Sequence, residues 1–174
     1  ILEKNLDKIN WDILSNNKNA IKLLEKNQNN INWTELSNNP NAINLLKNNI
    51  NKIDWFWLSS NPSAIHILEK NLDKIQWDFL SRNPNAISIL EKNLDKINWG
   101  ILSSNSNAIK LLEKNKDKID WYIILKNPSA THLIKEVIYD INPYITLDDS
   151  WNCKYVSSYL SQNTAAIDIL KEKI

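Results

Sequence analysis

Hydrophobic and aromatic residues return along this chain with a period of 22 residues. Tryptophan marks the period most clearly, at positions Trp11, Trp33, Trp55, Trp77, Trp99 and Trp121. The unit reads approximately I-L-E-K-N-L-D-K-I-N-W-x-x-L-S-x-N-P-x-A-I-x. A fixed period of about 20–50 residues is typical of repeat architectures, in which each unit packs mainly against its neighbours.

Each unit contains two short helical patterns. In the third unit, residues 61–70 carry apolar side chains with the three-to-four spacing of one helix face. Asn61 is expected to cap this helix, and Pro62 to occupy its first turn. Asn71 follows the last turn. We expect it to adopt the left-handed backbone conformation that often ends a helix, because asparagine accepts that conformation best after glycine.

The other helix of the third unit begins after Asp54 and is about two turns long. Asp, Asn or Gln occupies the equivalent place in every regular copy, and Asp and Asn are good N-cap residues. We expect Trp55, Trp57 and Leu58 to form its buried side, and Ile53 to pack just before the cap. Strands are disfavoured, because no alternation of polar and apolar residues persists.

These patterns predict an all-α fold: an αα-solenoid of stacked 22-residue two-helix repeats, with a right-handed superhelix. A unit of two short helices buries too little apolar surface to be stable alone, so adjacent units must complete its core. The six periodic tryptophans are expected to form a continuous internal row. Structural roles are also expected for two sets of polar residues: the caps and turn ties Asn17, Asn39, Asn61, Asn83, Asn105 and Asn127, and the serines Ser15, Ser37, Ser59, Ser81 and Ser103.

The repeats divide the chain into a regular and a divergent part. Residues 1–132 contain six regular copies of the unit. Residues 133–174 contain a divergent copy with an insertion at 144–157, followed by the start of a further copy. The chain begins at Ile1 rather than at Met, so we expect it to be a segment of a longer protein.

The composition narrows the possible functions. The 174 residues have a formal net charge of +1, and Arg82 is the only arginine among 21 basic residues, so no strong attraction to nucleic acid or membranes is indicated. A single glycine, Gly100, excludes a glycine-rich phosphate loop, and the lone Cys153 excludes an intramolecular disulfide. No apolar run approaches the ~20 residues of a membrane-spanning helix.

Residues with catalytic or metal-binding chemistry are sparse. His66 and His132 are three units apart, too far to share a metal ion at ~10 Å per unit. The serines recur from copy to copy, whereas a catalytic serine would be singular. Asp148 and Asp149 are expected to belong to an ordinary polar loop. We therefore expect no enzyme and no cofactor.

Differences between copies are the most informative signal for function. One variable position carries Asp12, Thr34, Phe56, Asp78, Gly100 and Tyr122, and a second carries Asn16, Asn38, Ser60, Arg82, Ser104 and Lys126. Both are expected to lie on the first helix of each unit, away from its buried side. Repeat scaffolds make their contacts through such positions, and aromatic and arginine side chains contribute most to interfaces. The candidate interaction residues are Phe56, Arg82, Tyr122, Lys126 and, in the insertion, Trp151. Neutral surface drift is the alternative explanation.

The sequence INW-x-x-LS-x-NPNAI-x-LLEKN resembles tandem repeats in proteins of giant DNA viruses of the mimivirus kind. The resemblance is clearest in residues 31–49 and 75–93, covers about residues 1–132, and returns weakly over 158–174. It implies a viral origin and a repeat scaffold, and it carries no catalytic residue. The insertion at 144–157 departs from the pattern.

Three functions are compatible with these features. The first is a scaffold that binds a partner protein, in the virion or in the host cytoplasm. The second is a structural component that associates with itself through its ends. The third is a nucleic-acid-binding repeat protein, with one base per unit. The near-neutral charge and the single arginine disfavour the third, because backbone binding requires neutralised phosphates.

Overall fold

The computed structural model describes residues 6–139, and the side chains of residues 6–135. These residues form short α-helices, 3-10 helices and turns, with no strand among them, which confirms the all-α class. The chain divides into two compact units, the first ending at Ile89 and the second beginning at Leu90. The division falls inside one helix, α8 (Ile87–Glu91).

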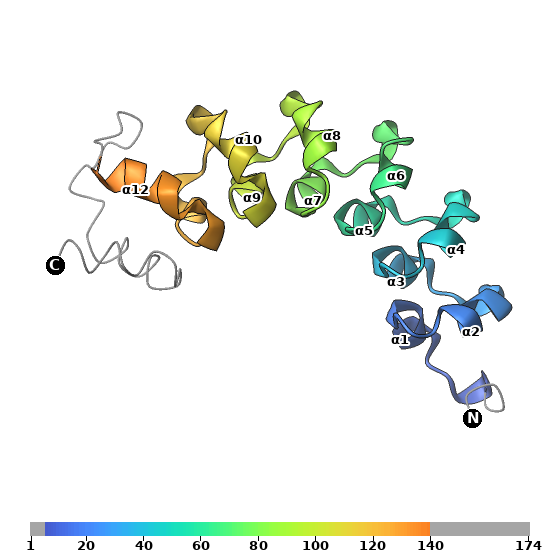
Figure 1. Ribbon diagram of the computed structural model, residues 1–174. Helices are drawn as coiled ribbons and strands as arrows, with labels where there is room; N and C mark the ends of the chain where they lie inside the picture. The colour runs from blue at the N-terminus through green and yellow to red at the C-terminus, as the bar shows by residue number, and fades with distance from the viewer. Residues whose placement is uncertain (1–5, 140–174) are drawn as a thin grey trace. The chain divides into compact units, whose positions relative to one another are not determined.

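The first unit contains two rows of helices (Figure 1). The first row consists of α1 (Trp11–Asn16), α3 (Trp33–Asn38), α5 (Trp55–Ser60) and α7 (Trp77–Arg82). The second row contains α2 (Ile21–Lys26), α4 (Ile43–Lys47), α6 (Ile65–Leu68) and the start of α8. Within the described residues of this unit, 3-10 helices accompany them: η2 (Leu6–Lys8), η3 (Gln28–Asn30), η4 (Ile50–Lys52) and η5 (Leu72–Lys74).

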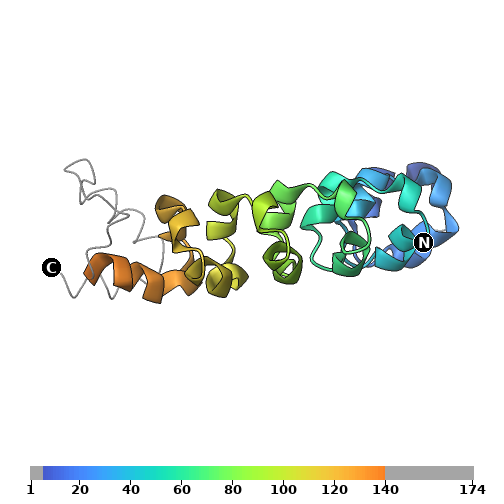
Figure 2. The same ribbon diagram turned by 90° about the horizontal axis from the view of Figure 1, so that it is seen from above.

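The second unit continues the same alternation. Its α-helices are the end of α8, α9 (Trp99–Ser103), α10 (Ile109–Glu113), α11 (Trp121–Ile124) and α12 (Thr131–Tyr139). Its 3-10 helices are η6 (Leu94–Lys96), η7 (Ser106–Ala108), η8 (Lys116–Lys118) and η9 (Pro128–Ala130). The helix α12 is the orange helix of Figure 2. It follows η9 directly and crosses the boundary at residue 132 that the repeat pattern predicts.

Equivalent helices of neighbouring repeats pack against one another. In the first unit α1 contacts α3, α3 contacts α5, and α5 contacts α7; in the second unit α9 contacts α11. Contacts between elements 22 residues apart define a solenoid of stacked helical repeats, so the predicted fold class is confirmed. The right-handed sense of the superhelix stays a prediction.

Leucine, rather than tryptophan, forms the fully buried row of the first helices. Leu36, Leu58, Leu80 and Leu102 have no exposed surface, whereas all six periodic tryptophans are half-buried. The expected internal tryptophan row is therefore wrong in its degree of burial. Each tryptophan is the first residue of its helix, so it lies at the edge of a narrow buried stripe that one leucine fills.

Lysines of the following repeat cover part of this tryptophan row. The ammonium of Lys52 lies 4.7 Å from the ring centroid of Trp33, and that of Lys74 lies 5.0 Å from the ring of Trp55. A cation over an aromatic face at this distance is attracted by the ring quadrupole, and the aliphatic stem shields the ring from water.

The predicted N-caps of the first helices are confirmed where Asn or Asp is present. The Asp54 carboxylate accepts hydrogen bonds from the amides of Phe56 and Trp57, and Asn10, Asn32, Asn98 and Asp120 cap their helices in the same way. Gln76 makes no side-chain cap. Its additional methylene group explains this, because a cap oxygen must reach the amides two or three residues ahead.

The second helix of the third repeat starts later than the sequence predicts. Helix α6 begins at Ile65, and Asn61 instead accepts a hydrogen bond of 3.0 Å from the amide of Ser63 inside a turn. Asparagine stabilises such turns by bonding the backbone two residues ahead. Pro62 thus belongs to the turn before the helix, rather than to its first turn.

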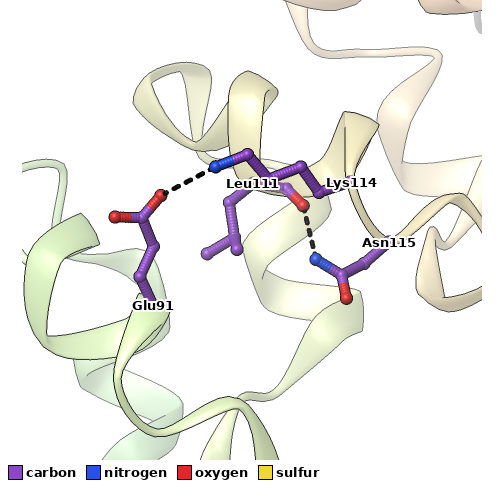
Figure 3. A network of polar contacts seen from close by, with 4 residues as sticks. All are labelled: Glu91, Leu111, Lys114 and Asn115. Carbon is purple, nitrogen blue, oxygen red and sulfur yellow. Dashed lines mark hydrogen bonds and ion pairs between the residues drawn. The ribbon is translucent and has the colours of Figure 1, made fainter.

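Asparagine ends the second helices by a mechanism that the sequence analysis did not anticipate. Asn71 has φ −138° and ψ 50°, and none of residues 6–139 has a positive φ, so the predicted left-handed ending is wrong. The Asn71 side-chain amide donates instead to the carbonyl of Ile67, at 2.8 Å. The same bond joins Asn115 to Leu111, next to an ion pair between Lys114 and Glu91 (Figure 3). The Asn71 side chain thereby adds a second donor to a carbonyl in the last turn, where the Lys70 amide also bonds at 3.3 Å.

A buried serine joins the first helix of a repeat to the following repeat. The Ser59 hydroxyl donates to the carbonyl of Trp55 at 2.7 Å and accepts from the amide of Gln76 at 3.0 Å. Ser15, Ser37 and Ser103 make the same pair of bonds with their own tryptophan and with the cap residue of the following repeat. The expected structural role of these serines is confirmed. In the sixth copy the buried residue Leu125 stands at this place.

A buried asparagine makes the second connection between repeats. The Asn61 side-chain amide donates to the carbonyl of Ser37, in the preceding repeat, at 3.0 Å. Asn39, Asn83 and Asn127 bond the preceding repeat equivalently. Each of these residues therefore ties its own turn with its oxygen and the previous repeat with its nitrogen.

Replacing the bridging serine tests this connection. Ser103→Ala leaves the Asp120 amide without its acceptor, and we expect it to lower the free energy of unfolding by about 1–3 kcal/mol in urea denaturation. Ser104→Ala is the matched control, because Ser104 is exposed and bonds only the Ile101 carbonyl; it should change stability by less than about 0.5 kcal/mol. Equal effects of the two substitutions would contradict the bridging role.

Charging the buried asparagine should be more damaging. Asn61→Asp removes the donor to Ser37 and places a carboxylate at a fully buried position, so we expect a loss of about 3 kcal/mol or more at pH 7. The loss should shrink as the pH falls, because burial raises the pKa of the new carboxyl and the protonated form regains a donor. The exposed Asn17→Asp is the control, and a similar loss there would refute the argument.

Candidate interaction surface

The first variable position lies on the surface of the first helices, as expected, whereas the second lies in the last turn of α1, α3, α5 and α7 but just beyond the end of α9 and α11, at Ser104 and Lys126. At the first position Phe56 and Tyr122 are exposed, and only Gly100 is half-buried. At the second position Arg82 and Lys126 are exposed, and Asn38 and Ser60 are half-buried. The residues that differ between copies are therefore accessible to a partner, whereas the leucines that recur are not.

Three aromatic side chains meet on the surface of the first unit. Phe56 and Trp57 come from α5, and Phe79 comes from α7, its neighbour in the first row. The ring centroids are 3.7 Å apart for Phe56 and Phe79, 5.3 Å for Phe56 and Trp57, and 6.4 Å for Trp57 and Phe79. We call these three residues the aromatic cluster.

The aromatic cluster is substantially exposed. Phe56 retains 43% of its surface and Trp57 39%, while Phe79 is half-buried. The sequence analysis was wrong to place Trp57 on the buried side of α5. It also missed Phe79 as a site residue. Both stand two residues after the periodic tryptophan, where other copies have Ile13, Glu35, Ile101 and Ile123, and this variation was the available signal.

An open hollow lies on the first row beside α1 and α3. Its volume is about 480 Å³, and it is lined by Asp12, Ile13, Asn16, Asn17 and Glu35. Ile13 is 71% exposed, the most exposed large apolar side chain among the residues described. Ile13 and Glu35 occupy the same place in their repeats as Trp57 and Phe79, so the hollow and the aromatic cluster belong to one row of equivalent positions.

Charge is unevenly distributed between the two rows of the first unit. The first-row helices and their caps carry one basic residue, Arg82, and four acidic residues: Asp12, Glu35, Asp54 and Asp78. Every lysine of residues 6–89 lies outside them, at positions Lys8, Lys18, Lys22, Lys26, Lys47, Lys52, Lys70 and Lys74. The first-row helices thus carry more carboxylates than basic residues, and the ammonium groups of Lys52 and Lys74, which lie over Trp33 and Trp55, come from the 3-10 helices η4 and η5.

The structure brings together only some of the candidate residues. Phe56 and Arg82 lie on the adjacent helices α5 and α7 of the first unit. Tyr122, which is 54% exposed, and Lys126 belong to the second unit. Trp151 lies outside the described residues, as do Cys153 and the insertion at 144–157.

Groups that could support catalysis are few in the described part of the chain. Within residues 6–139 no three histidine, cysteine or acidic side chains are grouped so that they could hold a metal ion. His66 is exposed, and His132 forms a hydrogen bond with Glu113 on the surface. The recurrent serines are committed to the bonds between repeats.

None of the helices within residues 6–139 combines the length and the apolar character required to cross a bilayer.

Comparison of the chain with protein-family models, with curated proteins and with solved structures finds no match.

The surface position of the aromatic cluster can be tested by its contribution to stability. Phe56→Thr introduces the residue that stands at the same place in the second repeat, and we expect it to cost only about 1 kcal/mol, the order of a ring–ring contact. Leu58→Ala, on the buried face of the same helix, should cost about 2–5 kcal/mol. If the two substitutions are equally costly in urea denaturation, the cluster is part of the core.

Proposed function

We propose that this chain is a non-enzymatic repeat scaffold that binds a partner protein through the aromatic cluster. The supporting observation is that Phe56 and Trp57 are exposed at the middle of a packed row of helices, next to Phe79. Aromatic side chains contribute a large share of binding energy at protein interfaces, because they bury a large area and lose little conformational entropy.

Rigidity of the scaffold favours this role. The cluster is mounted on α5 and α7, which are fixed to their neighbours by the buried bonds of Ser59 and Asn83. A surface that is already ordered loses less entropy on binding than a flexible one. The buried connections recur between copies while the outward residues differ, so one framework can present different side chains in each repeat.

The alternatives have less support. Nucleic-acid binding through the first row is disfavoured, because its four carboxylates repel phosphates and Arg82 is its single basic residue. Catalysis is disfavoured, because the recurrent serines already bridge the repeats. A structural, self-associating component remains the second candidate, and the experiment below separates it from the first. We further propose a viral origin, with the virion or the host cytoplasm as its location, on the resemblance to giant-virus repeats.

Capture of a partner with matched variants tests the proposal. The immobilised chain is incubated with lysate of host cells infected by a giant DNA virus. The cluster variant combines Phe56→Thr, Trp57→Ile and Phe79→Ile, residues that other copies carry at the same places. The control combines Leu72→Gln and Leu94→Gln, which remove two leucines that are each 43% exposed on 3-10 helices.

We expect one or more proteins to bind the parent and the control, and to bind the cluster variant at least tenfold more weakly in quantitative mass spectrometry. Circular dichroism and urea denaturation establish that both variants are folded. Equal capture by all three proteins would refute binding through the cluster. Recovery of the chain alone, with self-association in analytical ultracentrifugation, would favour the structural component instead.

A further inference from the structure

The charge around the aromatic cluster indicates the chemistry of its partner. Asp54 caps the helix that carries Phe56 and Trp57, and Asp78 lies next to Phe79 in the sequence. Asp12 and Glu35 line the hollow on α1 and α3. Arg82 is the only basic residue of these four helices, and the ammonium groups of Lys52 and Lys74, from η4 and η5, are already placed over Trp33 and Trp55. The helices that carry the aromatic cluster therefore supply carboxylates of their own.

Aromatic rings in this chain already bind cations. The ammonium groups of Lys52 and Lys74 lie over the rings of Trp33 and Trp55, at 4.7 and 5.0 Å. Among the described residues, no lysine or arginine lies over a ring of the aromatic cluster in this way. The cluster therefore offers exposed π faces beside carboxylates, a combination that attracts ammonium and guanidinium groups.

The geometry of the row favours an extended ligand. Packed helices lie about 8–10 Å apart, so α1 and α5 are separated by about 20 Å along the row. An extended peptide rises about 3.3 Å per residue, and about six residues therefore reach from the hollow to the aromatic cluster. Basic side chains spaced along such a peptide would meet carboxylates at both places.

We propose that the first row of helices binds an extended, arginine- or lysine-rich segment of a partner protein, with one cationic side chain against the rings of Phe56, Trp57 and Phe79. This inference rests on the proposed function and specifies the partner. Asp12 and Glu35 contact further basic side chains at the hollow. Because the carboxylates are at the surface, electrostatic attraction contributes to the association rate and weakens as salt increases.

Synthetic peptides of fixed length provide the probe. Three fluorescein-labelled ten-residue peptides are used, which alternate glycine with arginine, with glutamate or with serine. Their binding to the full chain is measured by fluorescence anisotropy at low and physiological salt. We expect the arginine peptide to bind at least tenfold more tightly than the serine peptide, and the glutamate peptide not to bind. Binding of the arginine peptide should weaken severalfold at the higher salt concentration.

Matched variants locate the binding site. We expect about tenfold weaker binding of the arginine peptide for the cluster variant Phe56→Thr, Trp57→Ile, Phe79→Ile, and severalfold weaker binding for Asp54→Asn with Asp78→Asn. Asparagine caps the equivalent helix in other copies, so Asp54→Asn retains the fold. The control Asp7→Asn with Asp73→Asn removes the same charge from 3-10 helices and should leave binding unchanged.

Each of the following outcomes would overturn the inference. The arginine peptide could bind no better than the serine peptide, or both charge variants could weaken binding equally, which would indicate attraction to net charge alone. Self-association that is lost in the cluster variant would identify a second copy of the chain as the occupant.

The two experiments together separate this inference from the proposed function. If a protein is captured through the aromatic cluster but the arginine peptide does not bind, only the basic partner is rejected, and the proposed function stands. If both measurements fail, both proposals are rejected.

Discussion

The buried serine that follows each Trp-x-x-Leu sequence makes the stacking of repeats specific. Its hydroxyl accepts from the cap amide of the next repeat and donates to the carbonyl of its own tryptophan. Apolar contacts alone would allow adjacent short helices to slide or rotate, because the hydrophobic effect has no direction. A donor and an acceptor buried at each junction fix the register, since any slip would leave polar groups unpaired in a dry environment. The buried asparagine reinforces the same register from the preceding turn. The outward row of helices, and with it the aromatic cluster, depends on this alignment.

The sequence alone was sufficient to predict the class of fold, because the tryptophan period and the recurrent caps are local signals that repeat six times. Asp54 could be recognised as a cap, since capping needs only an acceptor two or three residues before an amide. Details that depend on neighbouring repeats could not be predicted. Trp55 is half-buried, and Lys74 of the next repeat lies over its ring. Asn71 ends its helix through its side chain rather than through a left-handed backbone, and both endings have the same sequence.

The surface site was predicted only in part. Variation between copies identified Phe56 and Arg82 as outward residues, because a position that tolerates aspartate, threonine and phenylalanine cannot be in the core. Trp57 and Phe79 were not recognised as outward residues, because their position, two residues after the periodic tryptophan, is apolar in most copies, and an apolar position suggests burial. A six-residue helix is too short for that inference: Leu58 fills its buried stripe, and Trp57, one position earlier, is exposed to solvent. The excess of carboxylates on the first-row helices became visible only when the lysines were placed on other elements.

The hydrogen bonds between repeats also bear on how such a chain can change its length in evolution. Because the junctions formed by Ser15, Ser37, Ser59 and Ser103 are alike, an in-frame duplication or deletion of one whole repeat by unequal recombination would recreate a junction that already exists. The new copy would be compatible with its neighbours at once, and its outward residues would then be free to diverge. Leu125 breaks this equivalence, because it supplies no hydroxyl at the sixth junction. Each of the first five copies thus supplies the serine that a following copy needs, so these copies can exchange places. The sixth copy lacks this serine and cannot replace them.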